Sequence, residues 1–500
     1  MNSFHLKVKK LNIEDGNMMM VMINEAYALA NGLTSTDKIN IYHDKKEFVA
    51  DVVLSPDFPS DSIGVFSDVW KKFKLKDDDI VKISYVEANP KAVDAIRRKL
   101  LGKKINEEDT KLIISEIANG KLSDIQITYY VSSSFFYKPS NEELYFTAKA
   151  MAETGETFKF DSEIVADKHC MGGVPGNETT MIIVPIIASL GITIPKSFSK
   201  AITSPAATGE CVKTLMDIEF NKEEIYKLVK KTNSCLIWGG GLSLAPADDR
   251  IIKVSYPISM EPHSKAVISI MAKKAAMGIT HCVIDIPMGK TAKVHSMEDA
   301  LELKKKFEYV GKRFGMKMKV EITDAKQPIG AGIGPTLQTR EVLRVLEQHP
   351  KRPIDLENKA LYLASKLVEL TGYAKKSDSL RIVTEQLRLG NALKKMKEII
   401  KAQGGDPKIG CEEIRLGSVK YDFKAASDGI VKNIDMKFLN TIVRTLGCPI
   451  EETAGIYLHK KLNDFVEKGD KIFTMYTESE NRLKDALLML DEKSFYEIHN

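Results

Sequence analysis

A glycine-rich stretch at residues 167–180 contains the residue types that bind an anion. It follows a strand-like run at 162–166 and precedes an apolar run at 181–190. Glycines let backbone N–H groups approach an oxyanion, and the start of a helix adds positive partial charge. Lys168 contributes a full cation, and Thr179 and Thr180 contribute hydroxyl donors. The stretch predicts an anion-binding loop, with a purely structural turn as the alternative; it is not a Walker loop, because no Gly-Lys-Ser/Thr follows the glycines.

A second stretch of the same kind follows one strand later. Residues 192–196 read as a strand, residues 198–210 are rich in hydroxyl side chains and contain Lys200, and residues 211–218 read as a helix. Two successive strand–loop–helix units predict parallel strands that present their loops at one edge of a sheet. Ligands of open α/β sheets bind at that carboxyl edge. Two such loops suit a substrate with two anionic groups.

Both loops resemble signatures of the thymidine phosphorylase family. The first is Lys-His-Cys-Met-Gly-Gly-Val-Pro-Gly-Asn-Glu-Thr-Thr (168–180), and the second is Ser-Lys-Ala-Ile-Thr-Ser (199–204) with Thr208. Pro175 and the Ala-Ile-Thr-Ser core are most similar to the archaeal AMP phosphorylase branch of the family. The resemblance covers nearly the whole chain, in order, through residues 245–249, 256–262, 269–274, 284–293, 327–335, 403–407 and 454–462.

The resemblance implies a set of residues that bind the substrates. Lys168 and Gly173 would hold the first loop around an anion, Ser269 would contact the base or sugar, and Lys293 would bring another cation to a phosphate. The residues of the second signature would line the nucleotide site: Ser199, Lys200, Ala201, Ile202, Thr203, Ser204 and Thr208. Ser269 and Lys273 are four residues apart and so share a helix face. Lys273 is either a site residue or a solvated surface lysine.

Glu261 is the candidate proton donor. In the AMP phosphorylase branch, an aspartate eight residues before the serine protonates the departing base, and Glu261 stands in that place here. A glutamate has an ordinary pKa of about 4.3, so donation near neutrality requires burial or a nearby phosphate to raise it. The structural alternative is a glutamate that favours the start of a helix beside Pro262. His169 is either a packed loop histidine or a catalytic one.

The loops also depart from the family pattern. Serine is usual at the positions of Cys170 and Phe198, and arginine at that of Lys200. A thiol is a weaker donor than a hydroxyl, and lysine lacks the bidentate fork of arginine. Further departures are Met171, Ala207 and Glu210. These differences keep open a family member with altered or lost catalysis.

The main hypothesis is an enzyme of nucleotide salvage. It would convert a nucleoside 5′-monophosphate (AMP, with CMP and UMP as further substrates) and phosphate to free base and ribose 1,5-bisphosphate. The resemblance implies no metal or organic cofactor, and phosphate is a co-substrate. A pyrimidine nucleoside phosphorylase is the alternative enzyme, although its base pocket has an arginine where this chain has Val254. A non-catalytic nucleotide-binding protein is the other alternative, while an anthranilate phosphoribosyltransferase lacks the extra end domains.

The elements that position these loops predict a multidomain α/β protein. Clusters of β-branched residues at 21–24, 38–42, 48–53 and 80–83 predict a small barrel-like domain over 1–88. Helical periodicity at 91–101, 107–118 and 141–153 predicts helices over about 89–156. This stretch resembles the helical lobe of the family, which the resemblance implies is completed by 246–276. The resemblance implies that this lobe and an α/β lobe form a phosphorylase core over 89–420, of the nucleoside phosphorylase type II fold.

The remaining segments complete this prediction. Strands are expected at 282–286 and 319–322, and surface helices at 298–314 and 340–347. Residues 376–382 are polar and are expected to form a connector. Strand-like runs return at 429–435 and 471–476, which predicts a C-terminal α+β domain over 421–500.

Composition limits the function classes. The chain has 500 residues and a net charge of +5 from 73 basic and 68 acidic side chains, which gives no case for nucleic-acid binding. No Cys-x-x-Cys pair occurs among the six cysteines, so reduced thiols in a cytoplasmic protein are expected. The N-terminus lacks an apolar signal core, and the longest apolar run is too short to span a bilayer. The family implies a homodimer or a larger homo-oligomer.

Overall fold

The computed structural model describes residues 3–14, 19–35, 37–44, 46–86, 88–199, 204–255 and 263–499. The chain divides into two compact units. The first consists of residues 1–154 and 246–262, and the second of residues 155–245 and 263–500.

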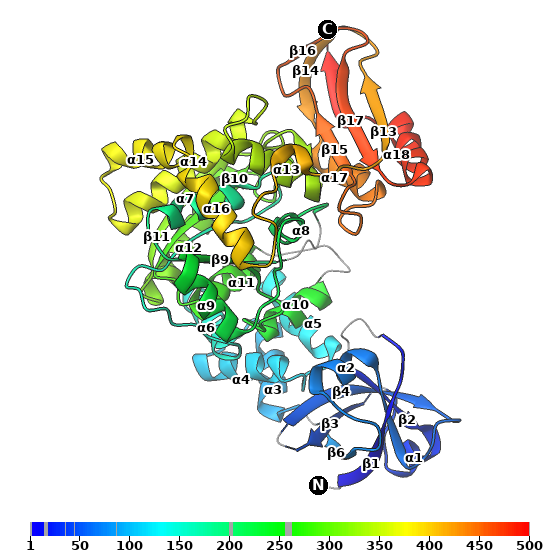
Figure 1. Cartoon of the computed structure of the whole chain (residues 1–500). Coiled ribbons are helices and arrows are strands. Elements are labelled where there is room, and N and C mark those ends of the chain that lie inside the picture. Colours follow the sequence, from blue (N-terminus) through cyan, green and yellow to red (C-terminus); the bar gives the residue numbers. More distant parts are fainter. Residues whose placement is uncertain are drawn as a thin grey trace. The chain divides into compact units, whose positions relative to one another are not determined.

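Six strands close into a barrel at the N-terminal end of the chain (Figure 1). The strands follow one another around the barrel in the order β1-β5-β2-β4-β3-β6, and their inward residues, such as Val8, Val21 and Ile39, are fully buried. The predicted barrel is therefore confirmed. Its elements are β1 (Ser3–Lys10), β2 (Met20–Asn24), α1 (Glu25–Ala30), β3 (Lys38–His43), β4 (Lys46–Ser55), β5 (Ser62–Val65), α2 (Ser67–Phe73) and β6 (Ile80–Tyr85).

The rest of the first unit is helical, as the periodicity predicts. It contains α3 (Pro90–Leu100), α4 (Glu107–Ala118), α5 (Asp124–Phe136), α6 (Asn141–Glu153) and α10 (Pro246–Ser255). Side chains of Asn106 and Ser123 accept hydrogen bonds from the first-turn N–H groups of α4 and α5, which fixes where these helices begin. The predicted helical lobe included 246–276; α10 belongs to the first unit, whereas residues 263–276 belong to the second.

A parallel sheet forms the centre of the second unit. Its strands are β7 (Ala166–Cys170), β8 (Ile194–Phe198), β9 (Ser234–Trp238), β10 (His281–Met288) and β11 (Lys317–Asp324). β10 lies between β11 and β7, β8 pairs with β9, and a parallel bridge between Val165 and Thr193 joins the two groups. β7 and β8 each begin and end later than predicted, because the turn after each strand is shorter than its glycine and hydroxyl residues suggested.

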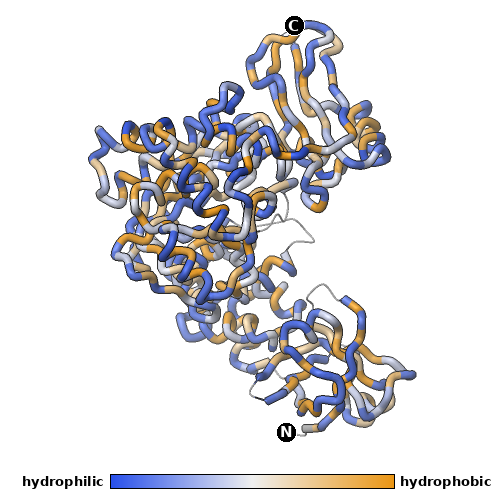
Figure 2. Tube along the Cα trace, in the orientation of Figure 1, coloured by the Kyte–Doolittle hydropathy of each residue, from blue (hydrophilic) through white to orange (hydrophobic). Residues whose placement is uncertain are grey.

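Helices cover this sheet. They are α7 (Thr179–Ser189), α8 (Thr208–Lys213), α9 (Lys222–Thr232), α11 (His263–Ala276), α12 (Met297–Arg313), α13 (Pro335–Leu346), α14 (Ile354–Thr371), α15 (Lys376–Arg388) and α16 (Asn391–Ala402). α7 is buried along almost its whole length, consistent with its apolar sequence. The connector predicted at 376–382 is wrong, because these polar residues start α15, which buries Val383 and Leu387 on one face. Both α15 and α16 mix hydrophobic and hydrophilic residues along their length (Figure 2).

The C-terminal part of the second unit is an α+β domain, as predicted. One antiparallel sheet has the order β12 (Gly332–Ile333), β15 (Gly455–Leu458), β17 (Lys471–Thr477) and β13 (Val419–Lys424). The other has the order β16 (Phe465–Val466), β14 (Gly429–Ile434) and β18 (Tyr496–His499), and α17 (Met436–Thr445), α18 (Glu480–Glu492) and the 3₁₀ helix η2 (Cys411–Glu413) complete the region. Phe473 is fully buried between the rings of Phe423 and Phe495. Because β12 comes from the segment before α13, this domain is bonded directly to the α/β lobe.

Candidate functional site

Three connections follow strands at the carboxyl edge of the parallel sheet. Residues 171–178 connect β7 to α7, residues 199–207 connect β8 to α8, and residues 289–296 follow β10. Because β7, β8 and β10 run parallel, all three loops leave the same edge of the sheet. We call the first of these, residues 171–178, the anion loop.

Close contacts fix the shape of the anion loop. Gly173 has φ +86°, and a Cβ added there would lie 2.9 Å from Cγ of Lys293. Gly176 has φ +74°, and a Cβ there would lie 2.1 Å from the carbonyl oxygen of Ile329. Neither position has room for a side chain, and both have a backbone conformation that glycine adopts most readily. The predicted site residues Gly173 and Lys293 are therefore in contact.

Lys168 lies on β7 beneath the anion loop. Its side chain is almost fully buried, and Nζ donates a 2.7 Å hydrogen bond to Oγ1 of Thr179, the first residue of α7. The positive charge thus lies at the N-terminus of this helix, whose partial charge has the same sign. The ammonium group of Lys168 and the positive end of α7 both attract an anion to this point. The hydrogen bond between Lys168 and Thr179 therefore suits an anion site.

A buried ion cluster surrounds the base of β7. Asp167 is fully buried, with Oδ1 3.1 Å from Nζ of Lys196 and Oδ2 paired with Nζ of Lys274. Burial alone would raise the pKa of Asp167, but the two lysines outweigh it and hold the pKa below its usual value. Burial lowers the pKa of Lys196 to about 8, against the opposing effect of Asp167. The aspartate is therefore ionised and Lys196 is mostly protonated at neutral pH.

A second buried pair lies on β10. Asp285 Oδ2 is 3.2 Å from Nζ of Lys359, and its Oδ1 accepts a 2.6 Å hydrogen bond from Thr323. Burial raises the pKa of Asp285, but Lys359 and Lys168 outweigh it and keep the carboxylate ionised. The carbonyl of Asp285 also accepts a 3.0 Å hydrogen bond from the N–H of Met171, which joins this pair to the anion loop.

These groups leave an excess of positive charge beneath the anion loop. Among the described residues, the two aspartates 167 and 285 face the four lysines 168, 196, 274 and 359. A buried charge is costly unless it is paired, so an excess of buried cations favours a bound anion. Lys196, Lys274 and Lys359 were not predicted from sequence, because only the folded structure brings β8, α11 and α14 to the aspartates of β7 and β10.

His169 cannot act as a cationic acid at this site. Burial, followed by the charges of Lys274, Lys196, Lys168 and Lys273, holds the pKa of His169 well below its usual value. The imidazole is therefore neutral at physiological pH, and it lies on β7 rather than in the loop that follows.

Glu178 connects the anion loop to the start of α8. Its Oε2 accepts a 3.1 Å hydrogen bond from Oγ1 of Thr208, and its Oε1 accepts a 3.2 Å hydrogen bond from Nε2 of Gln338 on α13. Thr208, a predicted site residue, is thereby held against the first loop. Burial raises the pKa of Glu178 to about 7. Sequence reasoning missed this residue, although an acidic side chain within an anion-binding stretch was a signal.

Ser269 and Lys273 share one face of α11, as predicted. Nζ of Lys273 lies 3.2 Å from Oγ of Ser269. Lys274, the next residue on this helix, reaches Asp167 on β7, so the end of α11 lies against the strand that precedes the anion loop.

The remaining predicted residues have the following positions. Ser199 is exposed and Ser204 is half-buried, at the two ends of the second loop. Lys200, Ala201, Ile202, Thr203 and Glu261 lie outside the described residues.

Two departures from the family pattern have a structural role. Sγ of Cys170 accepts 3.3 Å hydrogen bonds from the N–H of Gly172 and from Nδ2 of Asn177. Burial raises the pKa of this thiol to about 11, so it remains protonated and unreactive. Phe198 is buried in the hydrophobic core of the α/β lobe.

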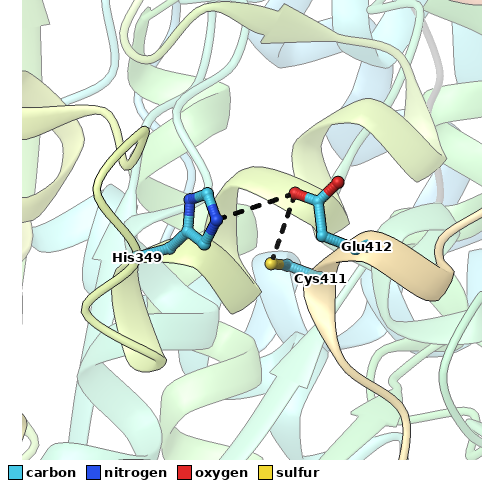
Figure 3. Close-up of side chains that lie close together, drawn as sticks. All are labelled: His349, Cys411 and Glu412. Carbon is cyan, nitrogen blue, oxygen red and sulfur yellow. Dashed lines mark hydrogen bonds and ion pairs between the residues drawn. The ribbon is translucent and has the colours of Figure 1, made fainter.

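Among the described residues, His349, Cys411 and Glu412 form one group of potential metal ligands (Figure 3). His349 Nε2 lies 3.9 Å from Oε1 of Glu412, which also lies 3.7 Å from Sγ of Cys411. Nδ1 of His349 accepts a hydrogen bond from the N–H of Lys351, so the neutral ring carries its proton on Nε2, where a metal would have to bind. A guanidinium nitrogen of Arg344 already lies 3.0 Å from Glu412. The chemistry of this group therefore fits an ion pair better than a metal site.

Three protein-family models match the chain. The α/β domain of the glycosyl transferase family matches residues 162–393, and the helical bundle domain of the glycosyl transferase family matches residues 93–155. The pyrimidine nucleoside phosphorylase C-terminal domain matches residues 430–497.

Several relatives match along nearly their whole length. AMP phosphorylase of Thermofilum pendens is 37% identical, covering 97% of this chain and 94% of the relative. AMP phosphorylase of Thermococcus sibiricus is 39% identical, covering 96% and 95%, and that of Methanosarcina barkeri is 36% identical, covering 96% and 94%.

Solved structures share the fold at low identity. Anthranilate phosphoribosyltransferase from Thermus thermophilus superposes with a TM-score of 0.54 at 15% identity, covering 62% of this chain and 99% of that one. The enzyme from Saccharomyces cerevisiae superposes with a TM-score of 0.51 at 14% identity, covering 63% and 98%. Within the described part of the chain, no helix combines the length and apolar character needed to cross a membrane.

The raised pKa of Glu178 predicts a pH-dependent stability. The folded protein holds this proton between about pH 4.5, the ordinary value, and about pH 7. The stabilisation that this bound proton gives to the folded protein is complete below that pH window and is lost as the pH rises through it. The glutamine of Glu178→Gln is neutral at every pH. Between pH 5 and pH 8, the free energy of unfolding of this variant should therefore rise relative to that of the wild type by on the order of 2–3 kcal/mol.

Thermal unfolding midpoints at pH 5, 6, 7 and 8 check this expectation. Glu492→Gln, at an exposed position of α18, is the matched control and should follow the wild type. Parallel curves for Glu178→Gln and the wild type would show that Glu178 is ionised in the folded protein throughout.

Proposed function

The chain belongs to the AMP phosphorylase family, as the resemblance of its sequence predicted, and we propose that it catalyses the phosphorolysis of AMP. An oxygen of inorganic phosphate forms a bond to C1′ of the ribose as the bond from C1′ to the base nitrogen breaks. A proton passes to the departing base. The products are free adenine and ribose 1,5-bisphosphate, and CMP and UMP are proposed as further substrates.

The positive excess beneath the anion loop carries this proposal. A phosphorolysis of a nucleotide brings two phosphate groups to one site, and their mutual repulsion must be offset by protein cations. Lys168 at the start of α7 and the ion cluster behind it supply that charge on the protein side. Lys293, in contact with Gly173, would supply a further cation at the rim.

The family pattern assigns the remaining roles. We propose that Lys168 and Gly173 hold one phosphate, and that Ser269 contacts the base or sugar. Glu261 is the proposed proton donor. The proposed nucleotide contacts of the second loop are Ser199, Lys200, Ala201, Ile202, Thr203, Ser204 and Thr208.

We propose that the reaction needs no metal or organic cofactor. Glycosyl transfer between a base and phosphate changes no oxidation state, and its charges can be met by the lysines named above. A cytoplasmic location in nucleotide salvage is part of the same proposal. All six cysteines are unpaired thiols, which is consistent with a reducing compartment.

We also expect a homodimer or larger homo-oligomer. Large apolar side chains project from the α5 helix, with Ile125 69%, Tyr129 54% and Phe136 78% exposed, and such surfaces usually mark an interface. Light scattering after size exclusion should give at least twice the 55.8 kDa of one chain. Ile125→Glu with Phe136→Glu should lower that mass. A monomeric wild-type protein would contradict the expectation.

The choice of substrate tests the proposed function directly. A charge-assisted contact to the 5′-phosphate is worth roughly 1.5–3 kcal/mol, so kcat/KM for AMP should exceed that for adenosine by about ten-fold or more. Base release is measured with and without phosphate, in EDTA, with AMP, CMP and UMP in parallel. Equal turnover of adenosine would favour a nucleoside phosphorylase. Nucleotide binding without phosphate-dependent base release would favour a non-catalytic protein.

The proton donor can be tested by changing Glu261. Glu261→Gln keeps the shape of the side chain but removes the transferable proton, so kcat should fall by roughly 10²–10⁴. Glu261→Asp, which restores the family's residue, should keep substantial activity. Steady-state phosphorolysis is combined with a binding isotherm for AMP, which should change little in either variant. A fully active Glu261→Gln enzyme would mean that another group supplies the proton.

A further inference from the structure

Residues 327–331, between β11 and β12, support the anion loop from outside. The N–H of Ile329 donates a 3.1 Å hydrogen bond to the carbonyl of Pro175. The carbonyl of Ile329 in turn lies so close to Gly176 that a Cβ there would be 2.1 Å away. The position of Ile329 therefore determines where the second half of the anion loop can lie.

Lys461 of the C-terminal domain holds this segment from the other side. Its Nζ donates hydrogen bonds to the carbonyl of Pro328, at 2.7 Å, and to that of Gly330. These two carbonyls flank Ile329 in the chain. The ammonium group thus fixes both neighbours of the residue that contacts the anion loop.

Asp355 on α14 closes this arrangement. Its Oδ2 lies 3.3 Å from Nζ of Lys461 and accepts a 3.0 Å hydrogen bond from the N–H of Gly330. One lysine and one aspartate therefore hold both the carbonyl and the N–H of Gly330. The neighbouring Leu462 N–H adds a 2.8 Å bond to Oε1 of Gln327.

The docking of the C-terminal domain does not depend on Lys461. β12 and β15 pair through Gly332 with Tyr457 and Ile333 with Ile456, and Leu458 N–H bonds to the carbonyl of Ala331. Backbone pairing already joins the domain to the α/β lobe. The side chain of Lys461 instead donates hydrogen bonds to the two carbonyls beside Ile329.

We propose that Lys461 is a positioning residue, through which the C-terminal domain holds the anion loop in its phosphate-binding shape. Its influence passes from Pro328 and Gly330 to Ile329, and from Ile329 to Pro175 and Gly176. This inference deepens the proposed function, because the loop is the proposed phosphate site.

The test compares Lys461→Met with Lys460→Met. Lys460 is the matched control, because it bonds to Phe465 and Asp470 within the C-terminal domain and not to residues 327–331. Amide hydrogen exchange is measured by mass spectrometry in peptides that cover 171–178 and Ile329. Loss of charge-assisted bonds should speed exchange there on the order of ten-fold in Lys461→Met, and not in Lys460→Met. Equal exchange in the two variants would overturn the proposal.

Kinetics provide the second arm. KM for inorganic phosphate should rise about ten-fold in Lys461→Met with a much smaller change in kcat, since a displaced loop weakens binding. Lys461→Arg, which keeps the cation and N–H donors, should recover most of the loss. An unchanged KM would overturn the proposal. The exchange arm needs no substrate, so it decides the role of Lys461 even if the wild type fails to release base from AMP.

A second variant covers the case in which Lys461→Met does not fold. Asp355→Asn weakens the same arrangement from the α14 side and keeps Lys461. It should increase exchange in the same two segments. Wild-type exchange in both segments would count against the proposal.

Discussion

The buried carboxylate of Asp167 organises the site. It lies on β7 and holds Lys196 from β8 and Lys274 from α11, so one ionised group ties three elements together at the base of the anion loop. Removing one partner of such a pair leaves an uncompensated buried charge, which is strongly destabilising. The position of the sheet, of α11 and of the loops that follow is therefore set by the same charges that give the site its positive field. The residues that pack these elements together are thus the ones that supply the charge for the proposed anion site.

The anion loop owes its shape to distant segments more than to itself. Gly173 and Gly176 let the backbone approach Lys293 on one side and Ile329 on the other. Within the loop, Cys170 accepts the bonds that a serine oxygen would accept, from Gly172 and Asn177. A substitution that looks damaging to phosphate binding in the sequence is thus compatible with the loop's internal bonding. The thiol is, however, a weaker hydrogen-bond donor toward a ligand than a serine hydroxyl would be.

Local features of the sequence were sufficient to predict the strand–loop–helix units, the barrel and the C-terminal domain. Glycines, apolar runs and alternation act over a few residues, so they can be recognised without the fold. β1 was missed because its lysines alternate with only a few apolar residues, and β5 because it has four residues. The start of α15 was mistaken for a connector, since the side chain that it buries there, Ser379, is polar and the first buried apolar side chain is Val383.

The parts of the site that escaped prediction are those made by long-range contacts. Lys196, Lys274 and Lys461 look like ordinary surface lysines in the sequence, and only the fold brings them to a carboxylate or a carbonyl. The family resemblance pointed to Lys168 and Gly173, whose binding roles remain proposals. It gave no information on the groups that hold those residues in place.

The negative charge of a glutamate inside the predicted anion-binding stretch would repel an anion, and the geometry explains how the site accommodates Glu178. Both oxygens of Glu178 accept bonds from Thr208 and Gln338, so the carboxyl group is already occupied by protein donors. With a pKa of about 7 it carries roughly half a charge at neutral pH. Even a fully ionised Glu178 subtracts one charge from four lysines and two aspartates, so the field beneath the loop stays positive. Glu178 can therefore join the anion loop to the start of α8 without removing the positive field that the proposed phosphate site requires.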